Sequence, residues 1–347
     1  MILKSIPVRK ATIREVAKLA SVSLGTVSNV FSGIRKCNPE TAERVFKAAK
    51  KLNYSPNHFA RSIRGGKTFN VGILISSVFG EDNPSLQDYL IALIGGLSRR
   101  NYMGLVEIWD INSPRPPKLI NCSDGIILVG MMPPSLIKLI ENLQLPTATI
   151  LEPLNIPNGF SVVANIQDTY ERAIGHLLAL RHEKIGFIIK HLDCETQLRK
   201  YEAFFAAMKT YRREVDKELI VALQDLDDRH FEDGYENSKR LLDSHPEMTA
   251  IIYSSDCLAK GGVVAIREAR LKIPRDISVI SIDNTEWARA YEPGITSGGR
   301  DVKLLSDMIL SGLFERIDTP GKIFPPEIKT YKEDFIIRAS TGSAKLR

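Results

Sequence analysis

From residue 70 onward, short apolar segments alternate with longer segments of helical periodicity, and this alternation is what most limits the possible folds. Strands that alternate with helices predict parallel sheets joined by right-handed crossovers. About nine strands over this length predict two lobes, with a ligand at the carboxyl ends of the strands. We expect strands at 71–76, 103–109, 125–130, 147–151, 161–165, 184–189, 250–255 and 277–283, and helices at 84–100, 134–143, 167–181, 196–211, 231–243 and 257–269.

Residues 12–31 predict a different structure, in which two short helices are joined by a tight turn. Thr12 and Glu15 have the spacing of a capping box, so a helix can begin there, and Ser23 can cap a second helix. The first helix has an apolar stripe, and the second leaves small polar residues on its outer face. This pattern indicates a helix-turn-helix, and the alternative is an ordinary pair of core helices.

A third helix is expected to begin at Asn38-Pro39-Glu40, which supplies a cap, a proline at the first position and an acid in the first turn. One of its faces is apolar and the other is basic. The apolar face comprises Ala42, Val45, Phe46, Ala49 and Leu52, and the basic face comprises Arg44, Lys47, Lys50 and Lys51.

The segment 56–64 reads as a fourth helix that is too short to persist alone in water. It carries Arg61 and Arg64, and Ile63 is its one large apolar side chain near the end. An apolar side chain flanked by arginines suits a wedge that enters the DNA minor groove.

Charge is distributed unevenly along the chain. Residues 1–69 carry 14 Lys and Arg against 3 Asp and Glu, a net charge of +11, whereas the whole chain is +6, so the remainder is −5. A basic head on a mildly acidic body predicts a polyanionic partner for the head.

Several other classes of protein are disfavoured. No apolar run reaches the length of a membrane span and the N-terminus has no signal-peptide pattern, so we expect a cytoplasmic protein. Four scattered cysteines read as free thiols in a reducing compartment: Cys37, Cys122, Cys194 and Cys257. Common nucleotide-binding and hydrolase motifs are missing, and the six histidines have no metal-ligand spacing, so we expect no enzyme, cofactor or metal.

Over about 12–341 the chain resembles the LacI/GalR family of bacterial transcription regulators. The resemblance is carried by TIREVAKLASVSLGTVSNV, PETAERVFKAAKKLNYSPNHFARSIR, DGIILVG, SSDCLAKG, IPRDISVISIDN and IIRAST, in this order. It implies an α/β chain with a small all-α helix-turn-helix head (1–55), a hinge helix and linker (56–69), and a two-lobed, periplasmic-binding-protein-like core with parallel sheets (70–342). Lobe one would comprise 70–164 and 296–322, and lobe two 165–295 and 323–342.

The resemblance also implies which residues contact DNA. Base-reading positions of the family fall on Leu24, Gly25 and Asn29, and phosphate contacts on Thr26 and Ser28. Asn29 suits adenine, whereas Leu24 offers only apolar contact and Gly25 has no side chain to read with. The hinge contacts would be Asn57, Arg61, Ile63 and Arg64.

Effector-contacting positions of the family fall on Ser76, Glu152, Lys200, Ser255, Asp283 and Arg300. Lys200 stands for a frequent Arg, and Arg300 for a frequent Gln. If the two acids are the only partners of the two bases, a neutral sugar suffices; if one cation is left over, an anionic ligand is favoured. The balance of two acids and two bases favours the neutral polyol.

Together these features predict a homodimeric repressor that binds double-stranded operator DNA and is controlled by a sugar-like effector, with no membrane contact. The alternatives are an enzyme or a free ligand-binding protein on the same doubly wound fold.

Overall fold

The structure is a computed structural model that describes residues 11–32, 37–54, 67–77, 84–150, 152–192, 195–223 and 229–345 of the 347-residue chain. The chain divides into two compact units, residues 1–69 and 70–347, which are treated separately below as the head and the core. Along the described residues, no helix is both long and apolar enough to cross a membrane.

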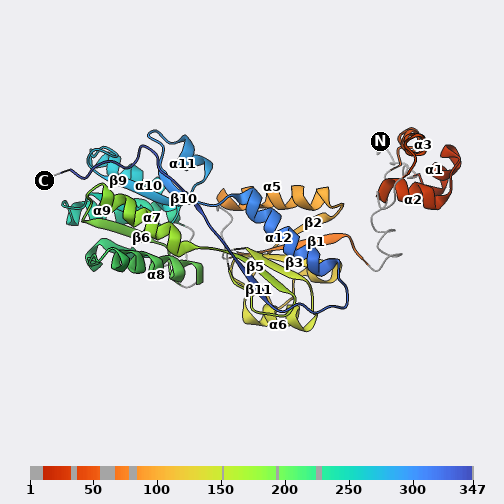
Figure 1. Ribbon diagram of the computed structural model, residues 1–347, viewed down its shortest axis with the longest axis horizontal. Helices are drawn as coiled ribbons and strands as arrows, with labels where there is room; N and C mark the ends of the chain where they lie inside the picture. The colour runs from red at the N-terminus through yellow and green to blue at the C-terminus, as the bar shows by residue number, and fades with distance from the viewer. Residues whose placement is uncertain are drawn as a thin grey trace, which may run out of the picture. The chain divides into compact units, whose positions relative to one another are not determined.

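Among its described residues, the head contains three helices around a small apolar centre (Figure 1). They are α1 (Ile13–Ala20), α2 (Leu24–Ser32) and α3 (Pro39–Lys51), and each contributes one fully buried valine, namely Val16, Val27 and Val45. The predicted capping box of Thr12 and Glu15 is present. The Ser23 hydroxyl oxygen accepts a hydrogen bond from the Thr26 amide at 3.0 Å, which begins α2 as predicted.

One predicted core position of the head is wrong. Phe46 is 50% exposed and meets Phe31 edge-on, with ring centroids 5.6 Å apart. Ala48, which was not expected to be inside, is buried together with Ala49. Phe46 therefore lies at the edge of the core, against the partly buried Phe31, while the alanines fill the inside.

The first sheet of the core comprises, within the described residues, six strands paired in parallel in the order β11-β5-β4-β3-β1-β2. On one face α5 (Pro84–Arg99) packs beside α12 (Val302–Ile317), and α6 (Pro134–Asn142) lies on the other (Figure 1). The short helix η2 (Lys118–Cys122) packs near β1 and β2. The strands are β1 (Asn70–Ser76), β2 (Met103–Trp109), β3 (Gly125–Val129), β4 (Thr147–Ile150), β5 (Gly159–Ala164) and β11 (Glu327–Tyr331).

The second sheet has the order β12-β10-β9-β8-β6-β7 and is parallel except for the pair β10 and β12. Its strands are β6 (Ile185–Ile189), β7 (Ile220–Ala222), β8 (Ala250–Tyr253), β9 (Ser278–Asp283), β10 (Thr296–Gly299) and β12 (Asp334–Ile336). One apolar cluster joins this sheet to α7 (Ile166–Ala179) and α8 (Glu195–Thr210). A second cluster joins it to α9 (His230–Ser244), α10 (Asp256–Glu268) and α11 (Glu286–Ala290). The short helix η3 (Lys217–Leu219) precedes β7.

The predicted lobe boundaries near the end of the chain are wrong in two places. β10, expected in lobe one, pairs with β9 in the second sheet, and β11, expected in lobe two, pairs with β5 in the first. The chain therefore crosses between the sheets after Ala164, after Gly299 and after Tyr331. The physical reason is that Thr296 and Ser297 are fully buried beside β9, whereas α12 packs against β4 and β5.

The elements that the sequence did not reveal are α11, α12, β7, β10, β11 and β12. Of the five residues of β11, only Tyr331 is buried, and β10 is the small polar sequence TSGG, so neither shows the apolar run of a central strand. The other predicted strands and helices of the core are present within a few residues of the expected bounds.

Candidate DNA-binding and effector sites

The outer surface of α2 presents the five residues expected to contact DNA. Leu24, Gly25 and Ser28 are exposed, and Thr26 and Asn29 are partly buried. A methyl group added to Gly25 would meet only the Ser23 hydroxyl oxygen, at 3.7 Å, so the start of α2 is open. The exposed residues of this face, Leu24, Gly25 and Ser28, are not part of the apolar core of the head.

The turn between α1 and α2 is held by a residue from α3. Arg44 donates from Nη2 to the carbonyl oxygens of Ala20 and Ser21, at 3.0 and 3.4 Å. Ser21 has φ 53°, the left-handed conformation that ends α1. Arg44 is exposed on the basic face of α3, as predicted, and it also stabilises the turn of the helix-turn-helix.

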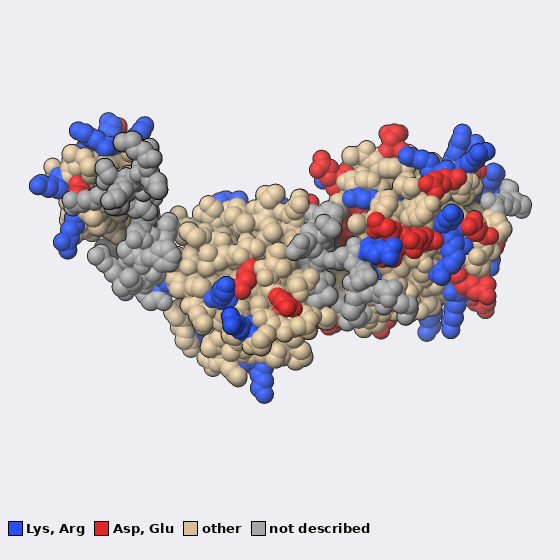
Figure 2. Space-filling model, turned by 180° about the vertical axis from the view of Figure 1, so that it is seen from behind, with Lys and Arg blue, Asp and Glu red and all other residues tan. Residues whose placement is uncertain are grey.

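Other basic side chains of the head remain at its surface (Figure 2). Lys47 pairs with Glu43 at 2.8 Å within α3, and Lys50 and Lys51 are exposed. The hinge residues Asn57, Arg61, Ile63 and Arg64 lie outside the described residues.

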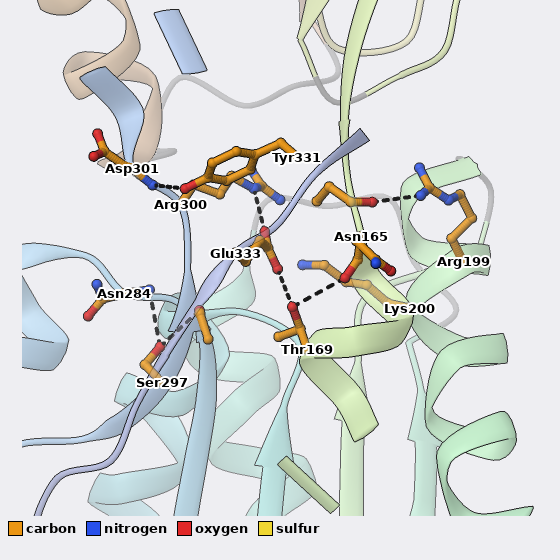
Figure 3. A network of polar contacts seen from close by, with 12 residues as sticks. Asn165, Thr169, Arg199, Lys200, Asn284, Ser297, Arg300, Asp301, Tyr331 and Glu333 are labelled. Carbon is orange, nitrogen blue, oxygen red and sulfur yellow. Dashed lines mark hydrogen bonds and ion pairs between the residues drawn. The ribbon is translucent and has the colours of Figure 1, made fainter. Parts of the chain in front are cut away.

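In the core, five of the six expected effector residues lie at or just after the carboxyl ends of strands, two in the first sheet and three in the second. Ser76 ends β1, Glu152 follows β4, Ser255 follows β8 and Asp283 ends β9. Arg300 follows β10, and Lys200 reaches the site from α8 (Figure 3).

Arg300 belongs to a buried polar network (Figure 3). Its Nε donates to the Glu333 carboxylate at 3.0 Å, and its Nη1 lies 3.4 Å from the Tyr89 hydroxyl. Glu333 also accepts a hydrogen bond from the Thr169 hydroxyl at 2.9 Å. Burial lowers the pKa of Arg300, but Tyr89, Glu333 and Asp283 together raise it above its ordinary value. Arg300 is therefore a permanent cation with a dedicated counter-ion.

Lys200 is also buried, but its contacts differ from those of Arg300. Its side chain is 3% exposed, and its Nζ donates to the carbonyl oxygen of Ser254 at 2.7 Å. No ion pair joins it to any carboxylate of the described residues. Burial lowers the pKa of Lys200, and Asp283 opposes that shift from beyond ion-pair distance.

Asp283 is partly buried and has φ 122°, a conformation that side-chain-bearing residues rarely adopt. A methyl group on Gly299 would lie 2.8 Å from the Asp283 carbonyl oxygen, so β10 can approach this turn only because position 299 is glycine. Such strain is typical of a binding site, because the surrounding structure must hold it in place.

Asp256, at the start of α10, holds the turn after Asp283 through hydrogen bonds. Its carboxylate accepts hydrogen bonds from the Thr285 amide at 2.7 Å, the Thr285 hydroxyl at 2.6 Å and the Ser281 hydroxyl. Burial, and secondarily Asp283, raise the pKa of Asp256 to about 6. Asp256 therefore positions the strained turn that carries Asp283.

The remaining predicted effector residues are Ser255, Glu152 and Ser76. The Ser255 hydroxyl accepts a hydrogen bond from the Leu258 amide at 3.3 Å, so it caps α10. Burial raises the pKa of Glu152, although hydrogen bonds from Thr196 act in the opposite direction. Ser76 is 1% exposed at the end of β1.

Sequence reasoning missed Tyr89, Thr169, Asp256 and Glu333. Tyr89, Thr169 and Asp256 lie in predicted helices or sequence motifs, where no pattern distinguishes them from their neighbours. Glu333 lies between β11 and β12, in a short segment that the sequence did not identify as the third crossing between the sheets. Only Asp256 had a usable signal, since an acid directly after a buried strand and before a helix is typical of a site in a parallel sheet.

Two family models match the chain. Residues 12–57 match the bacterial regulatory proteins of the lacI family, and residues 174–341 match a periplasmic binding protein-like domain. The first match contains α1, α2 and α3, and the second contains Lys200, Asp283, Arg300 and Glu333.

Relatives of known function are similar to almost the whole chain. The HTH-type transcriptional repressor PurR of Actinobacillus pleuropneumoniae is 28% identical over 341 residues, which is 95% of this chain and 98% of the relative. PurR of Mannheimia succiniciproducens is 29% identical over 321 residues, covering 88% of this chain and 92% of the relative.

Solved structures share the fold. A lac repressor dimer bound to operator and the anti-inducer ONPF matches with a TM-score of 0.75 at 20% identity, covering 96% of this chain and all of that one. The regulator CelR in complex with cellobiose matches with a TM-score of 0.68 at 23% identity, covering 95% of this chain and all of that one. A regulator from Enterococcus faecium with bound ribose matches with a TM-score of 0.69 at 22% identity, covering 80% and 100%.

Proposed function

This chain belongs to the LacI family of bacterial regulatory proteins, and from that premise we propose that it is a sequence-specific transcriptional repressor controlled by a small effector. The observation that carries the proposal is the presence, in one chain, of a helix-turn-helix with an open outer face on α2 and a core in which the charges of Asp283 and Arg300 both act on Lys200. Its relatives are regulators, and we assign it no catalytic role.

On DNA, α2 would enter the major groove, where Leu24, Gly25 and Asn29 face the bases and Thr26 and Ser28 face phosphates. Asn29 suits adenine, and Leu24 suits the methyl group of thymine. Asn57, Arg61, Ile63 and Arg64 would follow the adjacent minor groove, an assignment that rests on sequence alone.

The chain would act as a homodimer on a near-palindromic operator, because two-fold proteins read two-fold sites and the head has a small contact surface. The lac repressor structure that it resembles is a dimer on operator DNA. Such a regulator acts where the chromosome is, so we propose a cytoplasmic location.

The effector would bind at the carboxyl ends of the core strands and contact Ser76, Glu152, Lys200, Ser255, Asp283 and Arg300. Similar proteins hold cellobiose or ribose, which favours a polyhydroxylated ligand here. Binding would shift the equilibrium between two arrangements of the lobes and change operator affinity by a coupling of about 1–3 kcal/mol.

A selection from random duplexes, followed by gel shifts on the selected site at rising salt, tests the proposal. We expect a palindromic site and a steep fall in affinity with salt, since lysines and arginines of the head displace counter-ions from phosphates. Lys50→Ala should weaken binding, whereas Lys239→Ala, on an exposed position of α9 in the core, should not. An enzyme or a free ligand-binding protein on this fold would select no site.

A further inference from the structure

We propose that the effector of this chain carries an anionic oxygen group, a carboxylate or a phosphate, that binds the ammonium group of Lys200 while hydroxyl groups of the same molecule bind Asp283. The inference rests on the proposed function, because it concerns the same site, and it narrows the class of ligand. Two groups of opposite charge support it, the ammonium group of Lys200 and the carboxylate of Asp283.

The first is the ammonium group of Lys200. The group has three hydrogen-bond donors, Lys200 is 3% exposed, and among the described residues its one hydrogen-bond acceptor is the Ser254 carbonyl oxygen at 2.7 Å. A buried ammonium without an anion is unfavourable unless a partner arrives with the ligand. No carboxylate forms an ion pair with it in the part of the chain that the structure describes.

The nearby acids are already occupied. Glu333 is bound by Arg300 at 3.0 Å and by Thr169 at 2.9 Å, and both oxygens of Asp256 accept hydrogen bonds from hydroxyl or amide groups. Asp283 and Glu333 act on the pKa of Lys200 in the opposite direction to Arg300 and Lys190, but no described carboxylate forms an ion pair with its ammonium group. An anionic group of the ligand would supply the direct partner that these carboxylates do not.

The second unmet charge is the carboxylate of Asp283. It is partly buried, and among the described residues no side chain or backbone amide donates a hydrogen bond to it. Its backbone is held at φ 122°, and Asp256 fixes the turn that follows. An ionised carboxylate only accepts hydrogen bonds, so hydroxyl groups are suitable partners for it.

A ligand that satisfies both groups has hydroxyls on one side and an anion on another, as in a sugar acid or a sugar phosphate. A neutral sugar would satisfy Asp283 but leave Lys200 without an anion. The balance of two acids and two bases that favoured a neutral polyol does not hold in the fold, because Arg300 takes Glu333 as its partner instead of Asp283 or Glu152.

The test is a thermal-shift and calorimetric comparison of matched ligands on the full chain. The sets are glucose, gluconate and glucose 6-phosphate, and ribose, ribonate and ribose 5-phosphate, with inorganic phosphate alone as a further probe. In at least one set the acid or the phosphate ester should bind ten-fold or more tightly than the neutral sugar, and inorganic phosphate should bind more weakly than the ester. Whether the acid or the phosphate ester binds more tightly distinguishes a carboxylate from a phosphate. Equal or tighter binding of the neutral sugars, or no binding of any anionic member, overturns the proposal.

Variants at position 200 separate a ligand-binding role from a structural one. Lys200→Met should remove the preference for the anionic member and raise the unfolding midpoint of the free protein, because an uncompensated buried charge is gone. Lys200→Arg should restore the preference. Lys209→Met, at an exposed position of the same helix, should change neither quantity. A lower midpoint for Lys200→Met with an unchanged ligand preference would show that Lys200 is only structural.

Gel shifts with and without these ligands keep this result distinct from the proposed function. A wild-type chain that binds no DNA site in either condition refutes the regulator, whereas one that binds operator DNA and prefers neutral sugars refutes only the anionic ligand.

Discussion

Arg300 and Glu333 form an ion pair with 3.0 Å between Nε and Oε1, and the pair joins two of the three segments that cross between the sheets (Figure 3). The two side chains are 10% and 2% exposed. The contact of Arg300 with Tyr89 of α5 extends the link to a helix that covers the first sheet. The place where the chain passes between the lobes is therefore held by a buried charge pair.

Glu333→Gln should lower the free energy of unfolding by about 3–5 kcal/mol, because it leaves the buried guanidinium of Arg300 without its anion. Urea unfolding measures this. The double variant Arg300→Gln with Glu333→Gln should recover much of the loss, since no charge remains buried. Asp307→Asn, at the exposed pair with Lys303, serves as the control and should cost at most about 1 kcal/mol. A double variant no more stable than Glu333→Gln would contradict this account.

Asp256 should make stability depend on pH between about 4 and 6. Its pKa is about 6 in the folded chain against an ordinary value of 3.8, so the folded state binds the proton more tightly. This added stability of the folded state is fully present below pH 3.8 and is lost as the pH rises through 6. The free energy of unfolding changes by about 3 kcal/mol over this range.

Asp256→Asn should abolish this component, because an amide can keep the bonds to Thr285 while its nitrogen donates to Ser281. Denaturant unfolding from pH 4 to 8 measures the difference between the two proteins. Asp243→Asn, on an exposed position of α9, should retain the wild-type profile. Parallel profiles for wild type and Asp256→Asn would show that Asp256 does not titrate in this range.

Asn29→Ala should relax base preference at one position in each half-site, at a cost of about 1–3 kcal/mol of discrimination. Lys50→Ala should weaken binding to all sequences alike, because a phosphate contact carries no sequence information. Selection followed by sequencing compares the two variants with wild type. An unchanged site preference for Asn29→Ala would remove this residue from the reading surface.

Gly261→Ala should destabilise the core by about 3 kcal/mol. The added methyl carbon would lie 1.9 Å from the Phe231 carbonyl oxygen, so α9 and α10 would have to separate. Gly95→Ala, in α5, meets only the end of the Arg99 side chain at 3.6 Å and should stabilise the protein by about 0.5–1 kcal/mol. Chemical denaturation should give opposite signs for the two variants, and the same sign would contradict the close backbone contact.

The sequence by itself determined the local elements and the order in which they occur. The capping box of Thr12 and Glu15, the start of α3 at Asn38 and the strand at 103–109 were all predicted and are present. Each of these features depends on interactions within a few residues or on a periodicity that buries one face. Interactions and periodicities of this kind can be recognised in the sequence. The family, too, followed from several such segments in the right order.

Only the tertiary structure decided which strands share a sheet and which charges share a site. β10 and β11 exchange lobes relative to the prediction, because each has a weak pattern of its own and its pairing depends on the neighbouring strand that it meets. Arg300 is 33 residues from Glu333, and Thr169 is 164 residues from the same carboxylate. Charge compensation in a buried site depends on distances between such residues, which local sequence does not encode. For that reason the count of acids and bases favoured a neutral ligand, whereas their actual pairing leaves Lys200 in need of an anion.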